Sequence, residues 1–351
     1  MCATKQLQDA NRAQHPSYWL LVLLLGAGSL FACFPLRTRE WPPPIPQEDV
    51  PGLTLLTPGE NASFQNPTWS PDGSTLAFDL ATPLIGATRD TFPADAEIYI
   101  LDLETLSRQQ LTDNNFADVR PDWSPDGDQI VFVRSAANSG DPPAILLMVL
   151  SADGSSEEIL LECPSLCLDP RWSPDGELVA FGMEDGIWTI RRDGSDLRQA
   201  SGRKSAAASI PAWSPDGQRL VYWASQEATS ASQSTGGDLA VLDLSTGEET
   251  IVFSGGSPLD PDWSPVDSLI LFSNQAPQQE GWTLFTLDLE TGVARRLIPA
   301  DLGFNNLFDA VWSPDRTRIA FAYGFRDTAS HLYILDLAKL EALTSEPTAG
   351  P

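Results

Sequence analysis

Short apolar segments that end in an aromatic residue recur six times along this chain. The first runs from Leu76 to Phe78, and the equivalent segments end at Phe132, Phe181, Tyr222, Phe272 and Phe321. A second apolar segment follows each of them after a variable polar stretch. Aliphatic, β-branched and aromatic residues in runs of this length are typical of β-strands. The pattern therefore predicts pairs of apolar strands, and no helical periodicity follows residue 50.

Two further elements flank each pair of apolar strands. After the second strand come a turn rich in Asp, Thr and Gly and then a more polar segment, such as Arg108 to Thr112. Before the first strand stands a tryptophan followed by Ser-Pro-Asp-Gly. This order suits a type I turn, because Pro presets the first φ and Gly takes the left-handed position. Each repeat is therefore expected to hold four antiparallel strands.

Six tryptophans mark the repeat, at intervals of 41 to 54 residues: Trp69, Trp123, Trp172, Trp213, Trp263 and Trp312. The turn sequence is intact after the first four, whereas Asp267 and Arg316 replace its Gly in the last two. A period of roughly 40 to 50 residues with four strands per repeat is typical of a propeller blade. We therefore predict an all-β fold, a six-bladed β-propeller of four-stranded antiparallel blades over residues 52–344, with the tryptophans as buried anchors.

The two ends of the repeat region are expected to close the ring. The apolar segment Leu53 to Thr57 lies ahead of Trp69 at the spacing of an outermost strand, so we expect it to complete the sixth blade. Leu340 to Thr344 is a competing segment for that place. Pairing the two ends removes an open sheet edge. The tail, residues 345–351, is expected to be disordered.

The N-terminus resembles a bacterial export signal. Residues 18–32 are apolar but shorter than the roughly 20 residues of a membrane-spanning helix, so residues 1–32 are predicted to be a signal peptide. Leu30-Phe31-Ala32-Cys33 resembles the lipobox of bacterial lipoproteins, which implies lipidation of Cys33, although Phe31 is bulkier than that motif favours. An ordinary signal peptide and an uncleaved anchor are the alternatives. Residues 33–51 contain Trp-Pro-Pro-Pro-Ile-Pro, which predicts a semi-rigid tether.

The repeat itself, Pro-x-Trp-Ser-Pro-Asp-Gly with its Leu-Ala-Phe and Ile-Tyr-Ile-Leu-Asp strands, resembles the WD-like propeller repeat of the TolB family. The resemblance covers roughly residues 52–344. It implies an extracytoplasmic propeller in the bacterial cell envelope, attached to the membrane through Cys33, that binds other envelope proteins. The Tol system itself is not implied, because a lipobox and a short tether stand where TolB has an additional N-terminal domain. The oligomeric state stays open.

Charge narrows the class of partner. The formal net charge is −27, with 48 acidic and 21 basic residues. Nucleic acid and anionic membrane surfaces attract basic patches, so the composition argues against both. Membrane contact is therefore expected only through the N-terminal anchor.

Two cysteines lie within the propeller region. Cys163 and Cys167 flank Pro-Ser-Leu in the connection between the second and third blades. In an oxidising compartment they can form a disulfide, and a free pair is the alternative. Two cysteines are too few for a zinc site without further ligands.

A candidate site is expected at the mouth of the central channel. The residues three before each tryptophan should enter the innermost strands there; they are Asn66, Arg120, Asp169, Ile210, Asp260 and Asp309. Carboxylates on one arc of a narrow mouth concentrate negative potential, which suits Ca²⁺ or a basic side chain of a partner. The alternative is that these side chains bind backbone amides of neighbouring blades. The long loops Ala81 to Ala96 and Ser225 to Gly237 are the next candidates for a functional surface.

Catalytic motifs are sparse in this sequence. His15 and His331 are the two histidines, and there is no Gly-x-Ser-x-Gly elbow, His-Glu-x-x-His motif or phosphate loop. The sequence thus predicts a lipid-anchored binding propeller that is not an enzyme and has no cofactor other than a Ca²⁺ ion at the mouth. The second hypothesis is a propeller enzyme or sensor that acts on glycans or peptides through carboxylates at the mouth.

Overall fold

The computed structural model describes residues 50–82, 95–136, 144–183, 186–201, 210–225, 237–275, 281–299, 305–324 and 329–340. These residues all belong to the compact unit 41–351, which is separate from residues 1–40. The predicted signal peptide, Cys33, nearly all of the tether, the tail and most of both long loops lie outside the described residues. No helix in the described part of the chain is long and apolar enough to cross a membrane.

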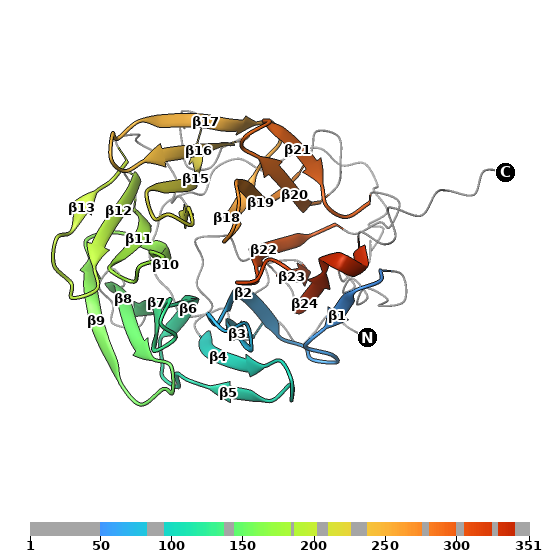
Figure 1. Cartoon of the computed structure of the whole chain (residues 1–351). Helices are drawn as coiled ribbons and strands as arrows, with labels where there is room; N and C mark the ends of the chain where they lie inside the picture. Colours follow the sequence, from blue (N-terminus) through green and yellow to red (C-terminus); the bar gives the residue numbers. More distant parts are fainter. Residues whose placement is uncertain are drawn as a thin grey trace, which may run out of the picture. The chain divides into compact units, whose positions relative to one another are not determined.

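In the described part of the chain, twenty-four strands form six blades around a common axis (Figure 1). Blade 1 holds β2 (Ser63–Trp69), β3 (Thr75–Ala81), β4 (Glu97–Asp102) and β5 (Arg108–Gln110). Blade 2 holds β6 (Ala117–Trp123), β7 (Gln129–Ala136), β8 (Ala144–Ser151) and β9 (Glu157–Cys163). Blade 3 holds β10 (Leu168–Trp172), β11 (Leu178–Met183), β12 (Gly186–Arg191) and β13 (Arg198–Gln199).

The second half of the ring repeats this order. Blade 4 holds β14 (Ala212–Trp213), β15 (Arg219–Ser225), β16 (Gly237–Asp243) and β17 (Glu249–Ser254). Blade 5 holds β18 (Leu259–Trp263), β19 (Leu269–Asn274), β20 (Thr283–Asp288) and β21 (Val293–Arg296). Blade 6 holds β22 (Leu307–Trp312), β23 (Arg318–Gly324), β24 (Ser330–Asp336) and β1 (Leu53–Leu55). The prediction of an all-β, six-bladed propeller is confirmed.

Blade 6 is completed by the first strand of the chain. β1 pairs antiparallel with β24, with Leu53 opposite Leu335 and Leu55 opposite Tyr333. A bridge between Ser63 and Ser330 also links β24 to β2, so blades 6 and 1 share one sheet. The predicted closure by the first strand is confirmed. Of the competing segment only Leu340 is described, and it lies in a helical turn over residues 337–340.

The repeated turn has the predicted geometry in four blades. Gly73, Gly127, Gly176 and Gly217 have φ between 67° and 78°, and each donates its amide to the Ser that opens the turn. Arg316 takes the same left-handed conformation, with φ 59°. Asp267 is not among the described residues with positive φ, so the blade 5 turn follows a different path. Of the two residues that replace the turn Gly, Arg316 therefore keeps its left-handed conformation and Asp267 does not.

The innermost strands carry an irregularity near the axis. The pairing register shifts between Gln65 and Thr68 in blade 1, and at the equivalent positions of blades 2, 3, 5 and 6. A residue with positive φ stands inside each shift: Asn66, Arg120, Asp169, Asp260 and Asp309, with φ from 50° to 59°. The strands begin one to three residues before these positions, so the expectation that the strands start there is wrong. A β-bulge explains the difference, because its extra residue re-aims the backbone within the strand.

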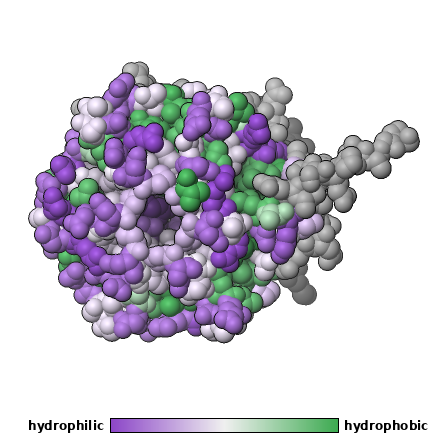
Figure 2. All heavy atoms as spheres, in the orientation of Figure 1, coloured by the Kyte–Doolittle hydropathy of each residue, from purple (hydrophilic) through white to green (hydrophobic). Residues whose placement is uncertain are grey.

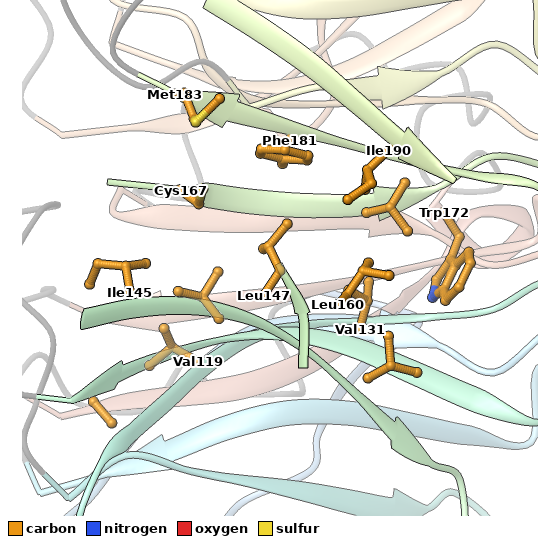
Figure 3. Close-up of a cluster of buried hydrophobic side chains, with 14 of the residues drawn as sticks. Val119, Val131, Ile145, Leu147, Leu160, Cys167, Trp172, Phe181, Met183 and Ile190 are labelled. Atoms are coloured by element: carbon orange, nitrogen blue, oxygen red, sulfur yellow. The ribbon is translucent and has the colours of Figure 1, made fainter. Parts of the chain in front are cut away.

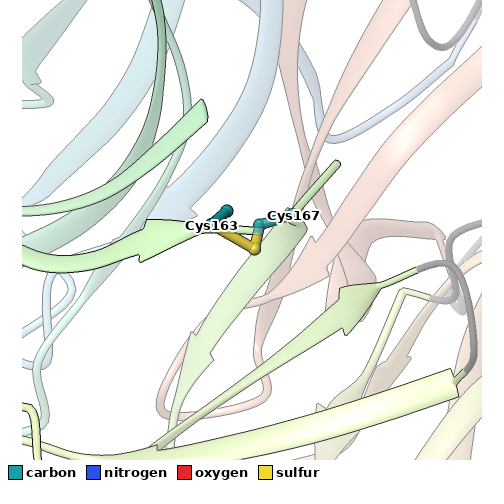
Figure 4. The surroundings of a disulfide bond; sticks show 2 residues. All are labelled: Cys163 and Cys167. Carbon is teal, nitrogen blue, oxygen red and sulfur yellow. A yellow bond between two sulfur atoms is a disulfide. The ribbon is translucent and has the colours of Figure 1, made fainter. Parts of the chain in front are cut away.

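The blades pack through apolar faces. Figure 3 shows one such cluster, in which Val131 and Leu147 of blade 2 lie near Phe181 and Trp172 of blade 3. Five of the six repeat tryptophans are buried, and Trp123 is the partly exposed member. The structure also joins Cys163 to Cys167 in a disulfide, with 6.1 Å between their Cα atoms (Figure 4). This bond closes the connection from β9 to β10.

Candidate functional site

The candidate site is the channel mouth, formed by the bulged residues of the innermost strands. Asn66, Asp169, Ile210, Asp260 and Asp309 line one cavity. The bulge holds five of the six expected residues in the left-handed region, which Asp and Asn tolerate better than other side chains. Repeated strain of this kind beside an axis is a feature of functional sites.

Carboxylates on one arc bridge neighbouring blades. Asp260 of blade 5 accepts from the amide of Asp309 at 3.5 Å, and Asp309 of blade 6 accepts from the amide of Asn66 at 3.4 Å. Behind them, Asp79 of β3 accepts from the Asn66 side chain at 2.7 Å and from the Arg120 amide at 3.0 Å. Asp260 and Asp309 thus lie on one arc of the mouth, as the sequence predicts. They also bind backbone amides of neighbouring blades, which is the alternative expectation.

The rest of the mouth differs in character from this arc. Arg120 of blade 2 forms a buried ion pair with Asp169 of blade 3. Blade 4 contributes Ile210, which is buried and lines the same cavity. The mouth therefore presents an acidic arc on blades 5, 6 and 1, an internally neutralised pair on blades 2 and 3, and an apolar sector on blade 4.

A second tier of charged residues lies two residues further along the innermost strands. Asp122 of blade 2 accepts from the amide of Trp172 at 2.8 Å, and Asp262 of blade 5 accepts from the amide of Trp312 at 2.8 Å. Arg171 of blade 3 places its guanidinium 3.8 Å from Asp122. These three residues form the inner tier of the channel.

Burial controls the protonation of the channel carboxyls. Desolvation raises the pKa of Asp79 to about 7, although the Arg120 amide and the Asn66 side chain oppose the shift. Desolvation likewise raises the pKa of Asp262 to about 7, against the Trp312 amide and the charge of Arg171. The pKa of Asp122 is raised by the same cause. Carboxyls with perturbed pKa values in a concave site are candidates for functional groups.

The free space at the mouth is small. The cavity among Asp169, Asp260 and Asp309 has a volume of about 10 Å³, which is room for one water-sized group. The space-filling view shows a hydrophilic hollow at the centre of the ring (Figure 2). Among the described residues, no three His, Cys, Asp or Glu side chains lie close enough together to hold a metal ion. The predicted Ca²⁺ site stays a prediction.

His331 lies apart from the mouth, at the seam where the ring closes. Its Nδ1 is 2.9 Å from the carbonyl oxygen of Thr57, and its ring stacks on Phe64. Burial lowers the pKa of this half-buried histidine. These contacts fit a structural residue that fixes the segment after β1.

Sequence reasoning missed Asp79, Asp122, Arg171 and Asp262. The last three stand directly before a tryptophan, where blades 1, 4 and 6 carry Thr68, Ala212 and Val311. Charge at this offset in half of the repeats was the signal that could have identified the inner tier. Asp79 gave a weaker signal, as a charged residue inside an otherwise apolar strand.

The chain is similar to several curated proteins, of which it spans less than half. It is 28% identical over 199 residues to the uncharacterized peptidase YuxL of Bacillus subtilis, covering 46% of this chain and 29% of that protein. It is 24% identical to dipeptidyl-peptidase 5 of Porphyromonas gingivalis, covering 72% and 43%. A TolB homolog of Chlorobium luteolum is 25% identical over 43% of this chain and 32% of its own length.

Solved structures show the same fold at low identity. TolB from Acinetobacter baumannii has a TM-score of 0.57 and 16% identity, covering 75% of this chain and 64% of that one. An oligogalacturonate lyase in complex with manganese has a TM-score of 0.52 and 18% identity, covering 81% and 92%. The propeller domain of the trilobed protease from Pyrococcus furiosus has a TM-score of 0.52 and 17% identity, covering 80% and 82%. No family profile matches the chain.

These comparisons overturn one expectation. The prediction that the chain is not an enzyme is wrong, because relatives named as peptidases point toward enzyme activity. The prediction failed because it took the lack of a catalytic motif in this chain as decisive, whereas the chain spans only 29% and 43% of those two peptidases. What the neighbours show about architecture is plain: this chain folds as a TolB-like β-propeller.

Proposed function

We propose that the propeller binds the positively charged amino terminus of polypeptides at its channel mouth, as the substrate-binding part of a peptide-processing enzyme. The observation that carries the proposal is the convergence of Asp260 and Asp309 on a cavity with room for one water-sized group. An ammonium group is about the size of a water molecule and donates three hydrogen bonds to oxygen acceptors. The similarity to proteins named as peptidases supports a peptide as the ligand.

The composition of the mouth favours a peptide over an acidic glycan. The neutralised Arg120–Asp169 pair leaves the acidic arc as the dominant charge of the mouth. An acidic sugar polymer would be repelled by that arc, whereas a peptide amino terminus is attracted to it. Ile210 of blade 4 is buried and lines the same cavity as Asp260, so one wall of the ammonium site is apolar.

Location and attachment belong to the same proposal. In this account Cys33 carries lipid and tethers the ring to a membrane of the cell envelope, where it meets envelope proteins and their peptides. The support is the lipobox resemblance and the TolB-like fold. Replacing Cys33 with Ser should move the protein from the membrane to the soluble fraction. Retention of the variant in membranes would contradict lipid attachment.

The binding experiment uses the full chain and the tripeptide amide Leu-Ala-Ala with a free amino terminus. Isothermal titration calorimetry compares wild type with the double variant Asp260→Asn, Asp309→Asn. Loss of two charge-assisted contacts should weaken binding at least about tenfold. The asparagines retain an acceptor oxygen for the neighbouring amides, so thermal stability should change little.

Two controls separate the site from general charge. The double variant Glu104→Gln, Glu290→Gln removes the same charge from exposed positions outside the channel and should bind like wild type. The N-acetylated tripeptide lacks the ammonium group and should not bind. Equal binding of the acetylated peptide, or wild-type affinity in the mouth variant, would contradict the proposal.

A further inference from the structure

The inner tier crosses the channel from one side of the ring to the other. Blades 2 and 5 are diametrically opposite in a ring of six, and they contribute Asp122 and Asp262. The charges of both carboxylates act on one another and on Arg171 of blade 3. Arg171 therefore lies near both carboxylates: its guanidinium is 3.8 Å from Asp122, and it lines one cavity with Asp262.

The backbone holds the two carboxylates in place without Arg171. Each accepts an amide hydrogen bond of 2.8 Å from the tryptophan that begins the next blade's turn. Asp122 also accepts from the Thr68 hydroxyl at 3.1 Å. The Arg171 side chain is held more loosely, since its guanidinium lies 3.8 Å from Asp122 and 3.5 Å from the carbonyl of Pro170. The carboxylates of Asp122 and Asp262 are thus fixed by hydrogen bonds, whereas the guanidinium of Arg171 is held only by longer contacts.

Arg171 also lines the cavity at the mouth together with Asp260, Asp309 and Asp262. The cavity is continuous from the acidic arc to this guanidinium. A ligand ammonium held at the arc therefore shares this cavity with a like charge, and like charges at short range oppose binding.

We propose that Arg171 is the gate of the channel, a resident cation that occupies the place a ligand's ammonium or guanidinium group takes when it passes beyond the mouth. The proposal rests on the proposed function of the mouth and adds the residue that limits the depth and affinity of binding. In the free ring the guanidinium fills the inner tier, so a cationic ligand reaches only the arc. Displacement of the Arg171 side chain opens the inner tier to the ligand. The apparent affinity of the ligand for the inner tier is therefore its intrinsic affinity multiplied by the fraction of time that Arg171 is displaced.

A chemical-rescue experiment tests the gate without any peptide. Arg171→Ala should leave a guanidinium-sized space between Asp122 and Asp262, and the probe is methylguanidinium chloride at millimolar concentration. The variant should gain several degrees in melting temperature with the probe. The probe should not raise the melting temperature of wild type or of the exposed control Arg198→Ala. It should also fail to raise that of the double variant Arg171→Ala with Asp262→Asn. If Arg171→Ala shows no gain in melting temperature, or if wild type shows the same gain, the proposal that Arg171 is the gate is contradicted.

A second arm measures peptide affinity. Leu-Ala-Ala amide should bind Arg171→Ala at least about tenfold more tightly than wild type, because the competing charge is gone. Arg171→Met, which keeps the side-chain length without the charge, should show the same direction of change if the alanine variant fails to fold. If peptide affinity is unchanged in both Arg171→Ala and Arg171→Met, the gate proposal is contradicted, but the proposal that the mouth binds a peptide amino terminus is not. Rescue by methylguanidinium with no peptide binding in any form would support the gate and contradict the proposed ligand.

Discussion

Aspartates of the turns and aspartates of the channel have opposite properties in this propeller. In the repeated turns, the Ser hydroxyl donates to the Asp carboxylate at 2.5 to 2.7 Å. These hydrogen bonds lower the pKa of the turn carboxyls, to about 2 for Asp126 and Asp315. In the channel, burial raises the pKa of Asp79 and Asp262 to about 7. The ionised form of an aspartate is thus stabilised in five of the repeated turns and destabilised at Asp79 and Asp262.

The difference separates two roles of acidic residues. The turn aspartates repeat in five of the six blades and satisfy the backbone of their own turn, so they serve the fold. Asp79, Asp122 and Asp262 are not repeated in every blade, and burial makes them costly to ionise. Native proteins tolerate such costly groups mainly at functional sites. The contrast supports the channel as the place of the proposed function and assigns the turn aspartates to the fold.

The largest expected effect comes from the residue that links the two regions. Trp172 donates its backbone amide to Asp122 in the channel, while Arg192 lies 5.5 Å above its ring near the turn. Trp172→Ala should lower the free energy of unfolding by about 3–5 kcal/mol, as truncations of large buried side chains do. Urea denaturation measures the change. A loss under about 0.5 kcal/mol would contradict the burial of this side chain.

Removing a turn carboxylate should have a smaller effect that depends on pH. Asp126 accepts from the Ser124 hydroxyl and the Asp128 amide and pairs with Arg192. Asp126→Ala should cost about 1 kcal/mol at pH 7, because these contacts are partly exposed. The folded pKa lies below the unfolded one, so the contribution is present above pH 4 and is lost as the pH falls toward 2.

Thermal melts at several pH values check this prediction. The exposed neighbour Asp128 is the matched control, and Asp128→Ala should change stability by less than about 0.5 kcal/mol. A loss that is equal for the two variants, or independent of pH, would show that the turn does not depend on the ionised Asp126.

The smallest expected effect lies in the altered turn of blade 6. Arg316→Gly removes a left-handed arginine, which by itself should stabilise by up to about 1 kcal/mol. Arg316 also pairs with Asp267 at 2.9 Å and lies 5.7 Å above the ring of Trp312, and loss of these exposed contacts costs a similar amount. The net change should be near zero. In an Asp267→Ala background the ion pair is absent, and Arg316→Gly should stabilise the protein. A loss of stability in that background would contradict the claim that the left-handed Arg316 is strained.

The ring could be predicted from sequence because its determinants are local and repeated. Six copies of one turn and its strands fix the blade, and the phase of Leu53 to Thr57 fixes the closing strand. The bulge escaped prediction, because a residue such as Asp260 adopts positive φ through pairing with its neighbouring strand. The inner tier escaped for a related reason: Asp122 and Asp262 meet only across the axis, 140 positions apart.

The enzyme prediction failed for a different reason. Complete catalytic motifs are absent from this sequence, whereas the similarity to peptidases covers only part of their length. A binding surface at a channel mouth carries no short motif of its own. Its recognition required the positions of Asp260, Asp309 and Arg171 in three dimensions.

A buried carboxyl such as Asp79 is ionised only at a cost to stability, so the stability of the ring should depend on pH through this residue. The free energy of unfolding of Asp79→Asn is compared with wild type from pH 4 to pH 8. Asp79 has a folded pKa of about 7 against 3.8 unfolded, so folding favours its protonated form and wild type loses stability as the pH rises through this window. The asparagine keeps an acceptor for the Arg120 amide, so its advantage over wild type should grow by up to about 4 kcal/mol between pH 4 and pH 8. A difference between the two proteins that stays constant with pH, or an asparagine variant that loses ground as the pH rises, would contradict the account.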